Sequence, residues 1–255
     1  MIPRILVVAG SDSGGGAGIQ ADIKTITMLG GHAMTAITAI TAQNTLGVQA
    51  VHAVPADMVV AQMHSVMEDI GVDAVKIGMI GSAATAHAVA DVLEALDVPI
   101  VFDPVMVATS GAVLADPPTI AAFERLMRLA SVTTPNIPEM AALGGEEAVL
   151  AQGCYVVAKG GHGDGATITD RLLSPGGEIR RLTGKRFDTD DTHGTGCTLA
   201  SALATNLASG LAIEDAFVKA VRFVRIALLA APGLGAGHGP MGHALGVVPF
   251  DELEG

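Results

Sequence analysis

Short apolar runs alternate along the chain with longer segments in which apolar residues recur every three or four positions. The apolar runs predict buried strands at residues 5–9, 75–77, 100–102, 132–133, 156–158 and 167–169. The three- to four-residue spacing predicts helices at residues 18–29, 57–70, 82–96, 118–129, 195–207 and 214–230, with Asp57 and Ser82 as the N-caps of the second and third. This alternation predicts an α/β fold, in which helices cover both faces of a mostly parallel sheet.

The sequence shows no internal boundary. No linker, charge block, low-complexity run or fixed-period repeat interrupts the pattern. A length of 255 residues suits one large α/β domain, so we expect residues 1–255 to fold as a single domain. In open parallel sheets ligands bind beyond the carboxyl ends of the strands, so candidate chemistry is expected just after each strand.

Composition defines the kind of core. Apolar residues make up 50% of the chain and its mean hydropathy is +0.51, which argues against a disordered protein. The chain has no Trp, one Tyr and six Phe, so its core must be filled by close approach of helices and strands rather than by aromatic bulk. The 32 glycines predict tight turns and backbone that approaches ligands closely.

Charge and cysteine content narrow the class of function. A net charge of −12 argues against a nucleic-acid-binding protein, although a helix N-terminus and a single Lys can still bind a small anion. The two cysteines predict neither a disulfide framework nor a zinc site. The apolar run at 5–9 is too short for a signal peptide, and the uncharged segments 25–56 and 226–250 are too polar or too rich in Gly and Pro to span a membrane. We therefore expect a soluble, cytoplasmic protein.

The first candidate site lies after the first two apolar segments. Residues 10–18 form a Gly-rich stretch that lacks the patterns of a dinucleotide-binding loop or a P-loop, so it is either backbone that approaches a ligand or a tight strand–helix turn. Gln43 carries an amide that can donate and accept at once and so can bind the edge of a heterocycle. The alternative is an ordinary polar side chain satisfied within a loop.

Three charged residues follow later strands. Asp103 and Glu139 lie after consecutive predicted strands, where carboxylates suit Mg²⁺ held partly through water, although either acid alone could be a helix cap or turn residue. Lys159 stands at the end of the next strand beside two glycines. It can reach a phosphate as a point charge, or it is simply solvated.

The strongest element is the segment 191–198, which leads directly into an apolar helix. Its small residues leave backbone N–H groups free at a helix N-terminus, which favours an anion, in particular one that develops in a transition state. Cys197 lies in the first turn, where we expect its pKa to fall and its thiolate to act as a general base. A nucleophilic or an inert, buried Cys197 are the alternatives. We expect His193 to shape the loop rather than to transfer protons.

These motifs occur in a fixed order over nearly the whole chain, at residues 10–25, 42–45, 76–79, 103–106, 134–139, 159–162 and 192–197. Together they resemble the bacterial hydroxymethylpyrimidine/phosphomethylpyrimidine kinases of thiamine biosynthesis, which belong to the ribokinase-like superfamily. The resemblance implies a three-layer α/β/α fold, a homodimer, and use of ATP and Mg²⁺. It also implies two phosphorylations, first of 4-amino-5-hydroxymethyl-2-methylpyrimidine and then of its monophosphate.

The resemblance also implies a role for each residue that matches a motif. Gln43 would bind the aminopyrimidine, Cys197 would be the base, and the other implied roles fall into four groups. They are a substrate pocket shaped by Gly10, Asp22, Met79 and Val105, an ATP site with Lys159 and Thr192, a Mg²⁺ site with Asp103 and Glu139, and an anion hole of Gly194, Thr195 and Gly196.

The chain departs from the family pattern at three places. The segment 140–158 is short for the family and predicts the loss of much of a helix. Thr109 stands where relatives often carry Lys, in an expected lid at residues 107–111. Near the C-terminus, Ala236 replaces a residue that is often basic. The remaining alternatives are a pyridoxal/pyridoxine kinase of the same fold, a non-catalytic vitamin-precursor binding protein, and a thiol hydrolase. Gln43 favours the aminopyrimidine over a pyridine, the retained polar residues favour a catalyst, and no His or Asn partner supports a hydrolase.

Overall fold

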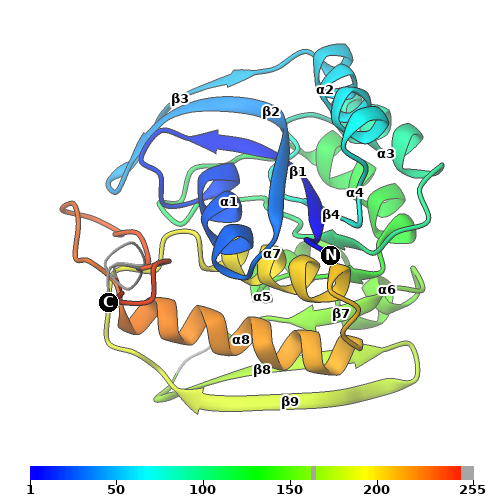
Figure 1. Ribbon diagram of the computed structural model, residues 1–255. Helices are drawn as coiled ribbons and strands as arrows, with labels where there is room; N and C mark the ends of the chain where they lie inside the picture. Colours follow the sequence, from blue (N-terminus) through cyan, green and yellow to red (C-terminus); the bar gives the residue numbers. More distant parts are fainter. Residues whose placement is uncertain (162–164, 248–255) are drawn as a thin grey trace.

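The computed structural model describes residues 1–161 and 165–247. His162, the last residue of the motif that begins at Lys159, lies outside the described residues, and so do residues 248–255. The described chain forms one nine-stranded sheet between two layers of helices (Figure 1). Its strands are β1 (Arg4–Asp12), β2 (His32–Asn44), β3 (Gly47–Ala53), β4 (Ala74–Ile77), β5 (Ile100–Phe102), β6 (Val132–Thr133), β7 (Tyr155–Ala158), β8 (Thr167–Ser174) and β9 (Gly177–Lys185).

The strand order is β3-β2-β1-β4-β5-β6-β7-β8-β9. The neighbours from β2 to β7 pair in parallel, whereas β3 at one end and β8 and β9 at the other pair antiparallel. The predicted mostly parallel sheet and all six predicted strands are confirmed. The carboxyl ends of the six parallel strands therefore meet at one edge of the sheet, where a ligand site is expected.

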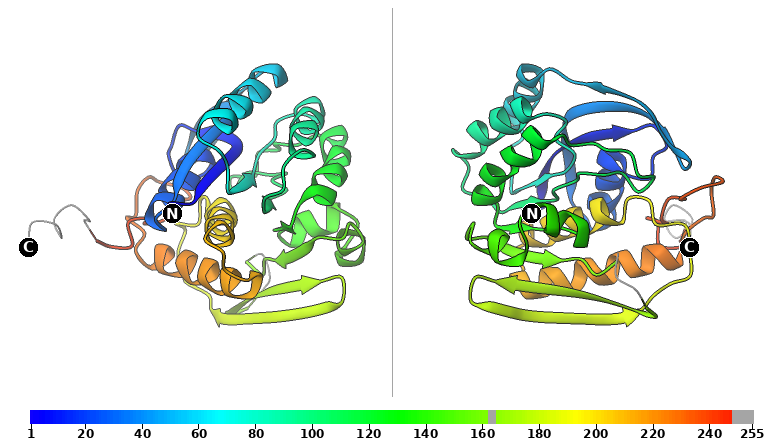
Figure 2. Two further views of the ribbon diagram at one scale, coloured as in Figure 1. Left: turned by 45° about the vertical axis from the view of Figure 1, so that its right-hand side comes forward. Right: turned by 180° about the vertical axis from the view of Figure 1, so that it is seen from behind.

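The helices divide into two layers according to the side of β1 that they cover (Figure 2). Leu6 and Val8 face one apolar cluster, whereas Ile5 and Val7 face the other, because successive residues of a strand point to opposite faces. The first cluster takes in α2 (Ala56–Asp69), α3 (Ala83–Leu93), α4 (Pro117–Leu129) and α6 (Glu146–Leu150), and the second takes in α1 (Gly18–Met28), α7 (Thr195–Ala208) and α8 (Ile213–Leu229). The predicted three-layer α/β/α fold is confirmed.

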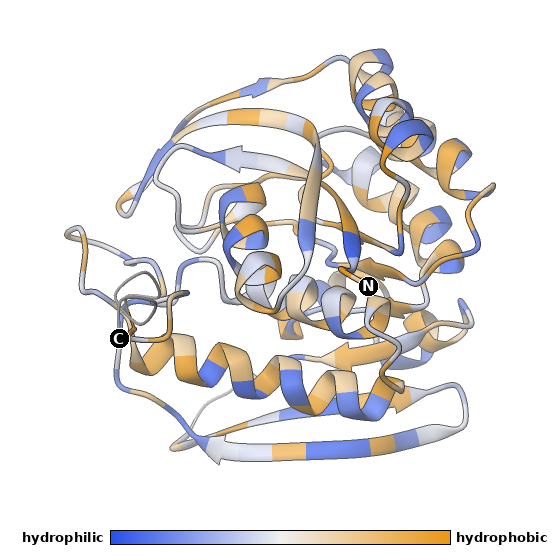
Figure 3. Cartoon of the chain, in the orientation of Figure 1, coloured by the Kyte–Doolittle hydropathy of each residue, from blue (hydrophilic) through white to orange (hydrophobic). Residues whose placement is uncertain are grey.

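Helix α7 shows how a core without Trp is filled. Its residues 198–206 are all buried, and four of these nine are small alanine or serine side chains that let α7 pack closely between the sheet, α1 and α8. Helix α8, by contrast, carries both hydrophobic and hydrophilic residues along its length (Figure 3). In residues 1–161 and 165–247, no helix is long and apolar enough to cross a membrane.

Three predictions about helices meet different outcomes. Ser82 caps α3 by accepting a hydrogen bond from the Thr85 N–H at 3.1 Å, as predicted. Asp57 as an N-cap is wrong, because α2 begins at Ala56 after Pro55, whose ψ of 139° holds the extended conformation that precedes a helix. The shortened segment 140–158 still contains the end of α5 (Ile137–Ala142) and all of α6, and Val149 of α6 is fully buried in the core.

Candidate active site

A cavity of about 1050 Å³ opens at the carboxyl ends of the parallel strands. Residues from the segments that follow β1, β4, β5, β6 and β7 line it, together with the first turn of α7. The structure brings together, on this one cavity, nearly all the residues singled out in the sequence. They are Gly10, Gln43, Met79, Asp103, Val105, Glu139, Lys159, Thr192, Gly194, Thr195, Gly196 and Cys197. Asp22 is the exception, because it has no exposed surface and lies behind the cavity wall.

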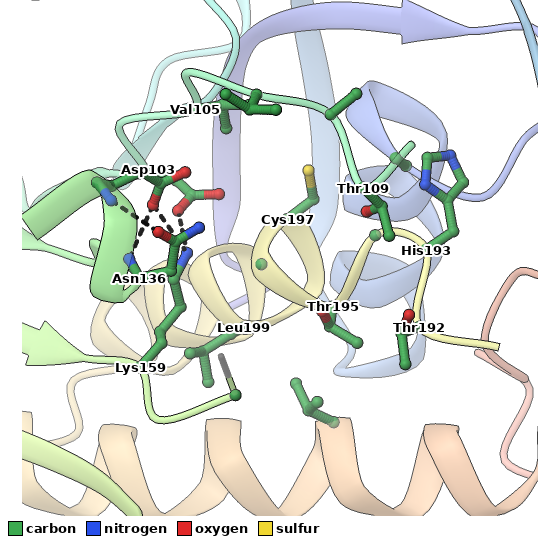
Figure 4. Close-up of a pocket in the computed structure, with 18 of the residues that line it drawn as sticks. Asp103, Val105, Thr109, Asn136, Lys159, Thr192, His193, Thr195, Cys197 and Leu199 are labelled. Atoms are coloured by element: carbon green, nitrogen blue, oxygen red, sulfur yellow. Dashed lines mark hydrogen bonds and ion pairs between the residues drawn. The ribbon is translucent and has the colours of Figure 1, made fainter. Parts of the chain in front are cut away.

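Asp103 and Lys159 lie on one side of the cavity (Figure 4). Glu139, which also lines the cavity, completes a charged cluster with them. Lys159 Nζ lies 2.7 Å from Asp103 Oδ1 and 3.8 Å from Glu139 Oε2. Burial raises the pKa of Glu139 above its ordinary value against the opposing effect of Lys159. Burial alone would lower the pKa of Lys159, but the two carboxylates outweigh it and keep this pKa raised, so Lys159 stays cationic.

Asn136 positions this cluster, a role that we did not predict. Its side chain accepts a hydrogen bond from the Glu139 N–H at 2.9 Å, while the Glu139 carboxylate accepts one from the Asn136 N–H at 2.8 Å. This reciprocal pair is a capping box at the start of α5, and it fixes the Glu139 carboxylate beside Lys159. The Asn-x-x-Glu spacing in the sequence is the signal that would have identified it.

The donor set fits a magnesium ion that keeps part of its water shell. Among the described residues, no group of three or more His, Cys, Asp or Glu side chains is arranged to hold a metal ion by itself. Mg²⁺, however, is commonly bound by one or two carboxylates together with substrate phosphates. The hydrogen bonds that Asp103 accepts from Thr134 and Lys159 both go to Oδ1, whereas Oδ2 faces the bare Cα of Gly196. A Cβ on Gly196 would lie 3.3 Å from that oxygen and would fill this space.

The start of α7 faces the same space. Gly194 adopts a left-handed conformation with φ of 84°, and a Cβ there would lie only 2.0 Å from the Gly16 carbonyl oxygen. Only glycine therefore lets the loop at residues 191–197 pack against the Gly-rich loop at residues 10–18. Because the first N–H groups of a helix have no intrahelical acceptor, the first turn of α7 presents donors and a partial positive charge to an anion in the cavity.

The Cys197 thiol points into the cavity between the charged cluster and His193 (Figure 4). Our prediction that its pKa falls is wrong: burial raises it to about 11. Lys76 lowers this pKa and the Gly18 N–H lowers it slightly, but burial, with the carboxylates of Asp22 and Asp103 added to it, outweighs both. In the empty cavity Cys197 is therefore a thiol at neutral pH.

A buried ion pair lies beneath this thiol. Lys76 on β4 and Asp22 on α1 have no exposed side-chain surface, and Lys76 Nζ lies 2.8 Å from Asp22 Oδ2. Ser201 of α7 donates to the other Asp22 oxygen at 2.6 Å. Burial by itself lowers the pKa of Lys76, but the charges of Asp22 and neighbouring groups, together with the hydrogen bond to Asp22, outweigh it and raise this pKa, so the ammonium group persists. The pair joins the sheet, α1 and α7 directly behind the cavity.

The opposite wall contains a second network that we did not predict. Asp12 at the end of β1 accepts hydrogen bonds from the N–H groups of Gly14, Gly16 and Ala17 at 2.8 to 3.0 Å. His193 Nε2 lies 2.9 Å from Asp12 Oδ2 and 3.1 Å from the side-chain amide of Gln43. His193 is 7% exposed and does shape the loop, as expected. An Asp directly before Ser-Gly-Gly is the signal for the turn that Asp12 closes.

A sequence profile described as phosphomethylpyrimidine kinase matches residues 12–242, which is most of the chain. The chain belongs to the phosphomethylpyrimidine kinase family. A hydroxymethylpyrimidine/phosphomethylpyrimidine kinase of Streptomyces coelicolor is 46% identical to it over 255 residues, which cover 94% of each chain. A multifunctional thiamine biosynthesis protein of Corynebacterium efficiens is 43% identical over 258 residues, and the match covers 94% of this chain but only 35% of that longer protein.

Solved structures of this family and of a related one share the fold. An ADP complex of Bacillus subtilis pyridoxal kinase superposes with a TM-score of 0.88 at 32% identity, covering 96% of this chain and 98% of the other. Phosphomethylpyrimidine kinase of Clostridium difficile gives a TM-score of 0.75 at 37% identity, covering 88% and 98%. The fold alone therefore does not separate phosphomethylpyrimidine kinases from pyridoxal kinases.

Two segments in which the chain departs from the phosphomethylpyrimidine kinase pattern border the cavity or its loops. Thr109 lines the cavity from a tight turn, in which the Ala108 N–H donates to the Ala112 carbonyl at 2.8 Å. The Gly-rich turn that contains Ala236 packs against Thr45, whose carbonyl accepts from the His238 N–H at 2.9 Å. The first segment can act on a ligand directly, whereas the second supports the β2–β3 turn.

Proposed function

We propose that this chain is an ATP-dependent kinase of thiamine biosynthesis that phosphorylates hydroxymethylpyrimidine and then its monophosphate. One observation carries the proposal. A single cavity joins an anion-binding helix start, a Lys–carboxylate cluster and the amide of Gln43, in a chain 46% identical to a kinase with this name. Phosphoryl transfer depends mainly on positioning and charge neutralisation, and these groups supply both.

Different groups in the cavity suit the pyrimidine and ATP. Gln43 can bind the aminopyrimidine edge, while Gly10, Met79 and Val105 line the same cavity. Lys159, Thr192 and the N–H groups of residues 194–196 suit the phosphates of ATP, and a solved pyridoxal kinase of this fold is an ADP complex. Asp103 and Glu139 would hold Mg²⁺, which when bound neutralises phosphate charge.

Cys197 is proposed as the group that accepts the proton of the attacking hydroxymethyl oxygen. Its sulfur points into the cavity from the first turn of α7, beside the N–H groups of the anion site. Because the raised pKa keeps this thiol protonated at neutral pH, bound substrates must lower the pKa of Cys197 before the thiolate can accept a proton. Asp22 shapes the pocket indirectly, through the ion pair with Lys76 beneath Cys197.

The first test is ADP release with Mg-ATP and, in separate reactions, hydroxymethylpyrimidine, its monophosphate and pyridoxine. We expect turnover of both pyrimidines and weaker turnover of pyridoxine. A preference for pyridoxine would favour the pyridoxal kinase, which the high TM-score of 0.88 makes the second candidate. Pyrimidine binding without any turnover would favour a non-catalytic binding protein.

Gln43→Ala is expected to raise the Kd for hydroxymethylpyrimidine about 10-fold or more, because the heterocycle edge then loses at least one hydrogen bond to the protein. Isothermal titration without ATP measures this directly. Asn44→Ala, a neighbouring amide that does not line the cavity, is the matched control and should change this Kd little. An unchanged Kd in the Gln43 variant would contradict the assignment of the pyrimidine to this wall.

We further propose a homodimer that forms through β3. This strand is the edge of the sheet, and the uncharged segment 25–56 leaves Ile40, Leu46 and Val51 between 47% and 68% exposed. Two copies of a chain with a net charge of −12 can approach most easily where neither carries charge. Light scattering should give twice the monomer mass, and Val51→Lys should give the monomer. A dimer that survives Val51→Lys would place the interface elsewhere.

The chemistry of the chain supports a cytoplasmic location and small-molecule partners. Cys154 and Cys197 are both free thiols, which persist in a reducing compartment. The net negative charge disfavours nucleic acid as a partner.

A further inference from the structure

The hydrogen-bond network of Asp12 fixes which nitrogen of His193 carries a proton. The Asp12 carboxylate is 3% exposed and accepts three backbone N–H bonds. Although burial opposes it, the bond to His193 and these N–H groups hold the pKa of Asp12 below its ordinary value, so Asp12 is an anion at neutral pH. An unprotonated Nε2 would set a lone pair against this anion at 2.9 Å. Nε2 of His193 must therefore carry the hydrogen.

That hydrogen in turn decides how the Gln43 amide is oriented. One end of the amide lies 3.1 Å from His193 Nε2, and the other end lies 3.2 Å from Thr41 Oγ1. The two ends have nearly the same shape, so their partners decide which is oxygen and which is nitrogen. Since Nε2 carries the hydrogen and has no free lone pair, an NH₂ group there would set donor against donor. The amide oxygen therefore belongs on the His193 side, where it shares the single Nε2 hydrogen with Asp12 in a three-centre bond.

The other end of the amide gives the same answer. The single hydroxyl hydrogen of Thr41 is used in its 2.9 Å bond to the Ser11 carbonyl. Thr41 Oγ1 can then only accept, so the Gln43 NH₂ group belongs on the Thr41 side. In this orientation no donor faces a donor and no acceptor faces an acceptor along Asp12–His193–Gln43–Thr41–Ser11, with the Nε2 hydrogen shared between Asp12 and Gln43. What remains free for a ligand is one N–H on the Thr41 side and one oxygen lone pair on the His193 side.

We propose that His193, held by Asp12, is a positioning residue that locks the Gln43 amide in one orientation and thereby selects the heterocycle. The inference rests on the proposed function for the identity of that heterocycle. An aminopyrimidine edge presents a ring-nitrogen acceptor beside an amino donor, and a locked amide matches it in only one placement. An unlocked amide can rotate to serve a ligand with the reversed pattern, so loss of the lock lowers selectivity.

His193→Phe tests the lock because it keeps a ring beneath Gly16 while it removes the Nε2 hydrogen. We expect this variant to raise the KM and Kd for hydroxymethylpyrimidine about 10-fold with a smaller change in kcat. The ratio of kcat/KM for hydroxymethylpyrimidine to that for pyridoxine should fall by a similar factor. Equal losses on both heterocycles would overturn the proposal.

A double-mutant cycle separates positioning from a structural role. In the Gln43→Ala background, His193→Phe should change the Kd by less than about 2-fold, because the group it positions is gone. His243→Phe is the matched control, since His243 is also buried but bonds Thr198 rather than Gln43. Its effect should be the same with and without Gln43. A full 10-fold effect of His193→Phe without Gln43 would overturn the proposal.

A measurement on the unchanged protein needs neither turnover nor a folded variant. Long-range ¹H–¹⁵N spectra of the ligand-free protein should show His193 with a protonated Nε2. An unprotonated Nε2 would overturn the lock, whatever the substrate is. Absence of turnover and of pyrimidine binding in the wild-type protein, together with a protonated Nε2, would instead remove the proposed function and leave the lock in place.

Discussion

Cys197→Ala should lower kcat for hydroxymethylpyrimidine by about 100- to 10,000-fold, the range expected when a positioned general base is removed. The Kd for the pyrimidine should change little, because the thiol lies at the anion end of the cavity and Gln43 holds the heterocycle. Single-turnover kinetics with saturating Mg-ATP, together with titration of the pyrimidine, separate the two effects. Cys197→Ser keeps the size but offers no base near pH 8, so it should lose nearly as much.

The raised pKa of Cys197 gives this prediction an independent check. With a pKa of about 11, roughly one thiol in 1,000 is ionised at pH 8, and the thiolate fraction rises tenfold per pH unit below that pKa. Alkylation of Cys197 in the ligand-free protein should therefore be slow at pH 8 and accelerate steadily towards pH 11. Peptide mapping distinguishes it from the buried Cys154. Rapid alkylation at pH 7 would contradict the raised pKa. Near-normal turnover of Cys197→Ala would remove Cys197 from the role of base.

Lys76→Met should lower the free energy of unfolding by about 3–5 kcal/mol, because it leaves the Asp22 carboxylate buried without its counter-ion. Lys76 and Asp22 are both fully buried, so no water can replace the lost partner. Urea unfolding followed by circular dichroism measures the change. The double variant Lys76→Met/Asp22→Leu removes both charges and should regain much of the loss.

Arg125→Met is the matched control for this ion-pair experiment. Arg125 pairs with Asp91 and Glu94, but both carboxylates are well exposed and Arg125 is partly exposed, so water can replace either partner. Arg125→Met should therefore lower the free energy of unfolding by much less than Lys76→Met does. Equal losses in the two variants, or a double variant no more stable than Lys76→Met alone, would show that the buried pair is not the source of the effect.

Most of the strands that the sequence predicts are buried on both faces, whereas residues 167–169 of β8 are exposed or half-buried. All four residues of β4 and all three of β5 are buried, and all of them except Lys76 are apolar, so each strand stands out as a short apolar segment. Strands β2, β3 and β9 escape prediction. Strand β2 mixes Thr and Ala with few large apolar residues, and β3 and β9 are largely exposed. Helices α5 and α6 have six and five residues, too few to show a helical period.

The candidate site is predicted wherever its residues lie at strand ends, since topology alone brings those ends together. Pairs joined only by tertiary packing are not predictable in this way. Lys76 and Asp22 are 54 positions apart, and His193 and Asp12 are 181 apart, with no local pattern that couples them. The error at Cys197 has a different cause. Partial charge at a helix start lowers a thiol pKa, but burial beside two carboxylates raises it by more.

The interlocked glycine loops have a consequence for biosynthesis. His193 bonds Asp12 in the first strand, and its N–H donates to the Gly239 carbonyl near the other end of the described chain. A protein emerges from the ribosome N-terminus first, so residues 10–18 wait through the translation of more than 200 further residues before this wall can close. Until then the Gly-rich loop and the Asp12 carboxylate, which is buried in the folded protein, lack their partner His193. Nucleotide and pyrimidine can therefore stabilise only the finished protein, and we expect assembly of this wall to be among the last steps of folding.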